Sequence, residues 1–229
     1  MKFPILILFV LLLSSATAQT LLPRLGITGS TNSQYTYKTS VNPGVGFTVG
    51  LGYNQQLTEK FSLQLELNYI QKAFSTDYAQ RFSQNVGTDT YFVDEKIKTY
   101  YRLPYLEVPL LLKVKFNKFF LNAGPYAAYG LGGSYHYTLD RTSSYLDPVH
   151  ESGSSDIKFG KSSAIGGNDV YLDNQWDLGF QAGLGILLFE KLLVECRYSR
   201  GSNLRDSGDS RNQSIQLTFS TSVNLKKAN

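Results

Sequence analysis

The chain has 229 residues, of which 17% are charged and 14% are aromatic. This length suits one large all-β domain, and so many aromatic residues with so few charges exclude an intrinsically disordered protein. The single cysteine, Cys196, excludes an intramolecular disulfide framework and a cysteine-rich zinc site. The formal net charge is +4, but the basic residues are scattered rather than gathered in a block, so a nucleic-acid partner is not expected.

Residues 1–18 have the features of a secretory signal peptide. A positive charge near the N-terminus precedes the apolar run Ile5–Leu13, and small residues follow up to Ala18. The nine apolar residues of this run are too few for a transmembrane helix, which needs about 20. We therefore predict export with cleavage before Gln19, followed by one β-barrel domain over residues 19–229.

Apolar and polar residues alternate with a period of two along most of this domain. The pattern predicts eight strands, over residues 24–30, 44–57, 61–74, 98–116, 119–138, 174–188, 192–200 and 213–225. Short connections between these strands alternate strictly with long ones. The long connections are residues 31–43, 75–97, 139–173 and 201–212. An outer-membrane barrel has this arrangement, with short periplasmic turns, longer extracellular loops and an even number of strands.

The alternation also gives each strand one apolar and one polar face. Leu65 and Leu67, for example, alternate with Glu66 and Asn68. In a soluble barrel the apolar face would fill the interior, whereas in an outer-membrane barrel it meets lipid and the polar face lines the lumen. The glycines of residues 44–52 share the polar face, and a narrow lumen needs small residues there. We predict the membrane barrel, with a soluble ligand-binding barrel as the alternative.

Outward-facing aromatic residues are predicted to lie at the ends of the strands. Near the long loops these residues are Tyr69, Tyr129, Trp176 and Tyr198, and near the short turns they are Tyr53, Phe61, Phe116 and Phe119. Aromatic residues at two such levels are typical of the girdles at the two membrane–water interfaces.

Charged residues also fall on the inward-facing side of several strands. Because an unpaired charge in a confined lumen would be costly, we expect carboxylates and basic groups to pair. The predicted network consists of Glu66, Glu107, Lys113, Glu195 and Arg197. Arg197 is its expected hub, because a planar guanidinium can hold two carboxylates. A proton or ion path is the alternative role, although eight strands leave an interior just wide enough for side chains.

Other chemistry is indicated only weakly. His136 and Ser134 share one strand face, which would suit a lipid-modifying enzyme. Four residues of a long loop are candidate ligands for an extracellular cation, although their spacing is irregular: Asp147, His150, Glu151 and Asp156. No motif indicates a cofactor, and we predict a non-enzymatic protein without a cofactor or a bound metal.

Two segments carry a resemblance to a known family. Residues 105–113, with the sequence YLEVPLLLK, and residues 120–126, with the sequence FLNAGPY, resemble the PorT-like outer-membrane barrels of Gram-negative bacteria. The resemblance covers nearly all of the predicted mature chain and implies an eight-stranded barrel in the outer membrane. It implies no single activity, since a few members of the family are tied to protein secretion or gliding machinery.

We therefore predict an all-β, eight-stranded antiparallel transmembrane barrel with short periplasmic turns and long extracellular loops. Its expected function is to bind a partner or surface component through residues 75–97 and 139–173, whose Tyr and Ser content suits adaptable contacts. The expected partners are outer-membrane lipid and other envelope or secretion proteins. A lipid-modifying enzyme is the alternative of a different class.

Overall fold

The computed structural model describes residues 19–33, 39–145, 147–160, 170–172, 174–189, 191–203 and 211–224. Regular structure in this part of the chain is β-strand throughout. The described residues contain no helix of the length and hydropathy that a membrane-spanning helix needs. The signal peptide predicted for residues 1–18 lies outside the described residues and stays a prediction.

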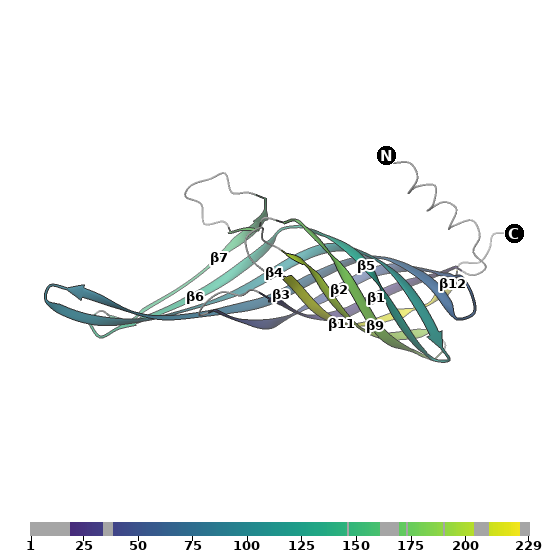
Figure 1. Ribbon diagram of the computed structural model, residues 1–229, viewed down its shortest axis with the longest axis horizontal. Helices are drawn as coiled ribbons and strands as arrows, with labels where there is room; N and C mark the ends of the chain where they lie inside the picture. Colours follow the sequence, from purple (N-terminus) through teal and green to yellow (C-terminus); the bar gives the residue numbers. More distant parts are fainter. Residues whose placement is uncertain are drawn as a thin grey trace.

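Eight antiparallel strands form a closed ring (Figure 1). In order around the ring they are β1 (Gln19–Ser33), β2 (Thr39–Gln56), β3 (Phe61–Val86), β4 (Asp89–Phe116), β5 (Phe119–Gly130), β9 (Trp176–Leu188), β10 (Leu192–Asn203) and β11 (Arg211–Thr221). β11 pairs back onto β1, where Phe219 lies opposite Leu25. Closure pairs the backbone groups of each strand with both neighbours, which hydrocarbon surroundings require. The predicted eight-stranded barrel is confirmed.

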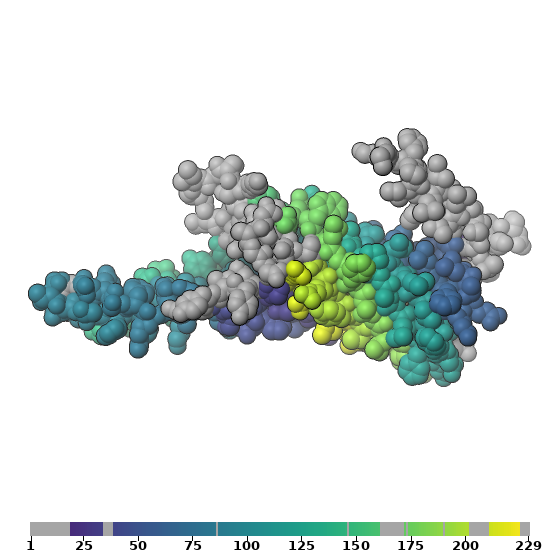
Figure 2. Space-filling view, in the orientation of Figure 1, coloured from purple at the N-terminus to yellow at the C-terminus, as the bar shows by residue number. Residues whose placement is uncertain are grey.

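Two of the ring strands, β3 and β4, continue into a sheet beyond the ring. β3 and β4 pair from Phe61 with Val114 at one end to Val86 with Asp89 at the other. The additional strands are β6 (Gly133–Ser143), β7 (Val149–Phe159), β8 (Val170–Leu172) and the short β12 (Val223–Asn224), which pairs with β1. β6 pairs with the outer part of β4, β7 pairs with β6, and β8 is parallel to β7. We call residues 74–86 and 89–102, together with β6, β7 and β8, the projecting sheet (Figures 1 and 2).

The projecting sheet corrects three details of the sequence analysis. Residues 75–97 are two strand segments joined by a tight turn at Gly87, whose φ is 65°, and not a loop. The predicted loop 139–173 contains the end of β6 and all of β7 and β8. The predicted strand 119–138 is two strands, because the chain leaves the ring at Gly132, whose φ is 106°. Outside the membrane neither face of a strand has to be apolar, so the alternation that identifies the ring strands is weak there.

The outer surface of the ring is apolar and its interior is polar. Leu110 is 41% exposed and Leu184 is 61% exposed, whereas Glu66 is 2% exposed and Glu107 is fully buried. This is the arrangement of an outer-membrane barrel, and it is the reverse of a soluble barrel.

The eight aromatic residues predicted as girdles lie on the outer surface of the ring. Tyr53 and Tyr69 are half-buried, and the other six are exposed. Tyr129 and Trp176 lie opposite each other on β5 and β9, with their ring centroids 5.0 Å apart. Phe116 pairs with Phe119 beside the short turn between β4 and β5. Their division into two interfacial levels stays a prediction.

The outward position of Leu110, in the middle of the ring part of β4, gives a test of the membrane assignment. We expect Leu110→Arg to lower the free energy of unfolding in lipid vesicles by about 2–4 kcal/mol, because a charge would face the bilayer core. Phe189→Arg is the control, since Phe189 is 90% exposed in the short turn between β9 and β10. Urea titration of both variants measures the effect, and equal small losses would contradict the assignment.

Candidate functional site

The lumen is lined by buried polar side chains that all eight ring strands supply. Residues of one parity point inward along each strand, so each strand contributes at least one such group. The middle of the lumen holds three basic and three acidic residues: Arg24, Lys113, Arg197, Glu66, Glu107 and Glu195. Their formal charges balance, as an enclosed set of charges requires.

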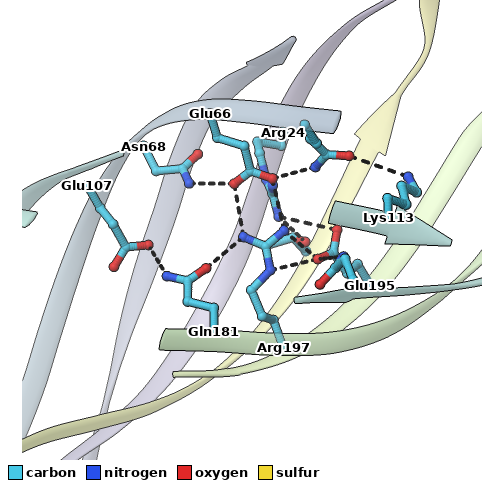
Figure 3. Close-up of polar contacts among 11 residues, drawn as sticks. Arg24, Glu66, Asn68, Glu107, Lys113, Gln181, Glu195 and Arg197 are labelled. Atoms are coloured by element: carbon cyan, nitrogen blue, oxygen red, sulfur yellow. Dashed lines mark hydrogen bonds and ion pairs between the residues drawn. The ribbon is translucent and has the colours of Figure 1, made fainter. Parts of the chain in front are cut away.

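Arg197 on β10 is the hub of this set (Figure 3). It is 1% exposed. Its Nη2 donates to Oε1 of Glu66 at 2.9 Å, and its Nη1 donates to Oε2 of Glu66 at 3.0 Å. Its Nε donates to Oε1 of Glu195 at 2.7 Å. One guanidinium therefore holds two carboxylates, from β3 and from its own strand, with the two-pronged geometry that favours arginine over lysine.

Arg24 on β1 is a second cation of the network that the sequence analysis missed. Its Nη1 donates to Glu66, and its Nη2 lies 3.6 Å from Oε2 of Glu195. The same Nη2 donates to Oγ1 of Thr218 at 2.8 Å. Glu66 and Glu195 are thus each held by two guanidinium groups. Arg24 shares the inward parity of Thr28, and the alternation of β1 could have identified it.

Among the described residues, Glu107 and Lys113 reach the network through amide side chains. Nε2 of Gln181 donates to Oε1 of Glu107 at 2.7 Å, and Oε1 of Gln181 accepts a hydrogen bond from the hub at 3.0 Å. Nζ of Lys113 lies 3.5 Å from Oε1 of Gln64 and 3.7 Å from the ring centroid of Phe120. Nε2 of Gln64 in turn donates to Oε1 of Glu66. Glutamine bridges therefore stand where the sequence analysis expected direct ion pairs.

A second polar cluster lies nearer the projecting sheet. Nζ of Lys72 is 2.7 Å from Oδ2 of Asp177, and both side chains are buried. The hydroxyl of Tyr126 donates to the same oxygen at 3.3 Å, and Nδ2 of Asn212 donates to it at 3.0 Å. The ammonium of Lys72 also lies 4.8 Å from the ring centroid of Tyr105. This pair occupies the loop end of the lumen, where the sequence analysis placed Lys72 and Asp177.

A buried apolar cluster covers this end of the lumen. It consists of Ile70, Phe74, Leu103, Tyr105, Tyr126, Ala128, Ile157 and Leu172. Ile157 belongs to β7 and Leu172 to β8, so these two strands of the projecting sheet pack over the mouth of the ring. A lumen filled by paired charges under an apolar cover has the construction of a structural core and not of a water-filled path.

The weaker candidate sites lie on the projecting sheet. Nδ1 of His136 is 3.0 Å from Oγ of Ser154 on β7, so the serine in contact with this histidine is not Ser134. His150 contacts Asp140. Within the described ranges, no group of three or more His, Cys, Asp or Glu side chains is placed to hold a metal ion.

An ion pair on the projecting sheet connects three of its strands. Nη2 of Arg141 on β6 donates to Oε2 of Glu95 on β4 at 2.6 Å, and Nε donates to the same oxygen at 3.0 Å. Nε2 of Gln80 on β3 donates to Oε1 of Glu95 at 2.9 Å. The hydrogen bonds from Arg141 and Gln80 hold the pKa of the Glu95 carboxyl below its ordinary value.

A sequence model of the outer membrane protein β-barrel domain matches residues 18–207. The chain belongs to this family. This protein is therefore an integral protein of the outer membrane, and the apolar outer face of its ring lies against lipid. By the general plan of such barrels, its short turns face the periplasm and its projecting sheet faces the outside of the cell.

Solved structures of other outer-membrane barrels are similar to this one. The attachment invasion locus protein Ail of Yersinia pestis has 14% identity and a TM-score of 0.41, over 90% of this chain and 99% of that chain. Neisserial surface protein A has 9% identity and a TM-score of 0.36, over 88% and 96%. The outer membrane protease OmpT of Escherichia coli has 8% identity and a TM-score of 0.32, over 92% and 98%. No curated protein sequence matches the chain.

Removing the hub should destabilise the barrel strongly. Arg197→Leu leaves the buried Glu66 and Glu195 with one guanidinium, and we expect a loss of about 3–5 kcal/mol, the range for breaking a buried ion pair. Urea unfolding in vesicles, followed by the fluorescence of the single tryptophan, measures it. Arg81→Leu is the control, because its ion pair with Asp94 is exposed and contributes little. An unchanged unfolding midpoint for Arg197→Leu would show that the ion pairs of Arg197 do not stabilise the barrel.

The Glu95 ion pair should make the projecting sheet sensitive to acid. Because the folded-state pKa lies below the ordinary value of about 4.3, the stabilisation is fully present above that pH and is lost as pH falls through the folded-state pKa. We expect an NMR titration of the Glu95 amide to show a midpoint below the ordinary value. Arg141→Gln should move that midpoint upward, and a midpoint insensitive to this substitution would contradict the assignment.

Proposed function

We propose that this barrel is a non-enzymatic, PorT-like outer-membrane protein that binds a protein partner of the cell envelope through its projecting sheet. The observation that carries the proposal is the sheet itself. It extends the ring outward on β3 and β4 and adds three further strands, so the surface beyond the membrane is ordered β-structure. A preformed surface loses less conformational entropy on binding than a flexible loop does.

A row of aromatic rings crosses the base of the projecting sheet. Phe74 on β3 stacks on Tyr101 on β4, with the ring centroids 4.8 Å apart. Tyr101 lies 6.3 Å from Tyr135 on β6, which lies 6.3 Å from Tyr137 on the same strand. The three tyrosines are half-buried, so part of each ring is open to contact. Tyrosine provides a large contact area together with a polar hydroxyl, which is why it is enriched in binding surfaces.

The hairpin formed by the outer parts of β3 and β4 also presents an open strand edge. Within the described part of the chain, residues 79–86 of β3 pair with β4 on one side, and β2 pairs with β3 only as far as Tyr78. Unpaired backbone groups on such an edge can accept an extended segment of another protein as an additional strand. We infer that a partner would use this edge for affinity and the aromatic row for specificity.

The PorT-like assignment is supported by the position of its motif. Residues 105–113 cross the ring on β4 and place Glu107 and Lys113 in the lumen and Pro109 against β5. The same barrel would then act within a secretion or envelope-assembly machine. That role predicts a loss of protein secretion when the gene is deleted, whereas binding of a surface component alone does not.

A lipid-modifying enzyme is the second candidate, and the contact between His136 and Ser154 is the observation in its favour. The two residues line a groove of about 510 Å³ together with Tyr100 and Arg102, beside the exposed Val45 of the outer wall. This candidate requires that the purified protein change the mass of lipid A or phospholipid, and that His136→Ala abolish the change.

Site-specific photo-crosslinking in intact cells tests the proposed binding surface. A photoreactive residue in place of Ser83, at the outer part of β3, should give protein adducts of defined mass, because this edge is the expected contact. The same residue in place of Leu178, which is 55% exposed on the ring, should give lipid adducts only.

A shortened hairpin provides the second arm of this experiment. Replacing residues 83–92 with an Asn-Gly turn removes the tip but leaves the paired Phe82 and Val93 to close the hairpin. This variant should insert normally and should compete less well for the partner than the intact protein does. Identical adducts at the ring and edge positions, or none at the edge, would contradict the proposal.

A further inference from the structure

The short-turn end of the ring contains a cavity that the proposed function does not use. Its volume is about 230 Å³, and its lining comes from β12 and all the ring strands except β11, together with the turn between β2 and β3 and the turn between β4 and β5. By the general plan of outer-membrane barrels, this end faces the periplasm. We call it the short-turn cavity.

The described part of the lining carries an excess of positive charge. Lys60, Lys113, Lys115 and Lys118 line the cavity together with one acidic residue, Glu59. Among the described residues, none of these four ammonium groups lies within ion-pair distance of a carboxylate. A concave surface lined by charges of one sign concentrates ligands of the opposite sign.

Lys113 connects the cavity to the charge network. Its side chain is buried, in contrast to those of Lys60, Lys115 and Lys118, which are exposed. Its ammonium has a long contact of 3.5 Å to Gln64 and lies over the ring of Phe120, so its described partners are an amide and an aromatic face. A buried ammonium is stabilised better by an anion than by either of these groups. Figure 3 shows it at the margin of the network, on the side away from Glu107.

Apolar side chains form the part of the lining next to Lys113. Leu22, Phe120 and Leu193 make a small buried cluster, and Leu187 packs against it. All four line the cavity beside Lys113. The cavity therefore offers an apolar surface next to the ammonium group of Lys113, which can still accept an anion as a partner. Three further ammonium groups lie around it.

We propose that the short-turn cavity binds a small organic anion from the periplasm, with a carboxylate or phosphate group on Lys113 and a short apolar group against Leu22, Phe120 and Leu193. The three exposed lysines attract the anion, and the buried lysine holds it. The site lies at the opposite end of the ring from the projecting sheet, so it is independent of the partner-binding surface.

NMR titration of the full-length barrel in a non-ionic detergent tests this site. N-acetyl-leucine presents a carboxylate and an apolar group, N-acetyl-leucinamide presents the apolar group alone, and inorganic phosphate presents the anion alone. We expect saturable shifts of the Lys113 and Phe120 amides with N-acetyl-leucine, weaker shifts with phosphate, and none with the amide. Equal shifts with the acid and the amide, or none with either anion, would overturn the proposal.

Lys113→Met is the matched variant, because methionine keeps an unbranched apolar side chain and removes the ammonium. It should weaken binding of N-acetyl-leucine by about tenfold or more, the loss expected for one charge-assisted hydrogen bond. Lys96→Met on the projecting sheet is the control and should bind normally. If Lys113→Met does not insert, the double variant Lys60→Gln with Lys118→Gln provides the same comparison at the rim. If the variant that inserts binds N-acetyl-leucine with unchanged affinity, the shifts arise from a different site and the proposal is wrong.

Discussion

A lipid bilayer offers no water to backbone groups or to charges, and this constraint determines the rest of the structure. The backbone groups must pair between strands, which requires the ring to close. Closure then places every second side chain of each ring strand inside the narrow lumen. The charged members of that set can remain there only if they neutralise one another, as Arg24 and Arg197 do with Glu66 and Glu195.

Strand length separates the membrane part of this protein from its outer surface. A membrane-crossing strand needs about 9–11 residues, whereas β3 has 26 residues and β4 has 28. The surplus continues with the same pairing into water, where β6 and β7 can join because the outer part of β4 has left its ring neighbour β5. The same pairing with β4 carries the open edge of β3, residues 79–86, beyond the ring.

The two ends of the lumen differ in chemistry. At the outer end, Ile157 and Leu172 of the projecting sheet complete an apolar cover over the Lys72–Asp177 pair. At the short-turn end, a cavity lined by lysines adjoins the network through Lys113. The central ion pairs separate these regions, so binding at one end requires no open passage to the other. The ring therefore presents a different surface at each of its two ends.

The period-two pattern predicted the ring, its inward residues and the hub Arg197, because lipid on one face and a polar lumen on the other leave a strong alternation in the sequence. The same pattern could not reveal residues 75–97 as strands, since polar residues stand on both of their faces. Parity also shows which side chains point inward but not which of them touch. Glu66 and Arg197 are 131 positions apart in the chain, and their contact depends on the register and tilt of strands that are not neighbours. Tertiary structure alone therefore decided that Arg24 shares the carboxylates and that Gln181 and Gln64 connect Glu107 and Lys113 to them.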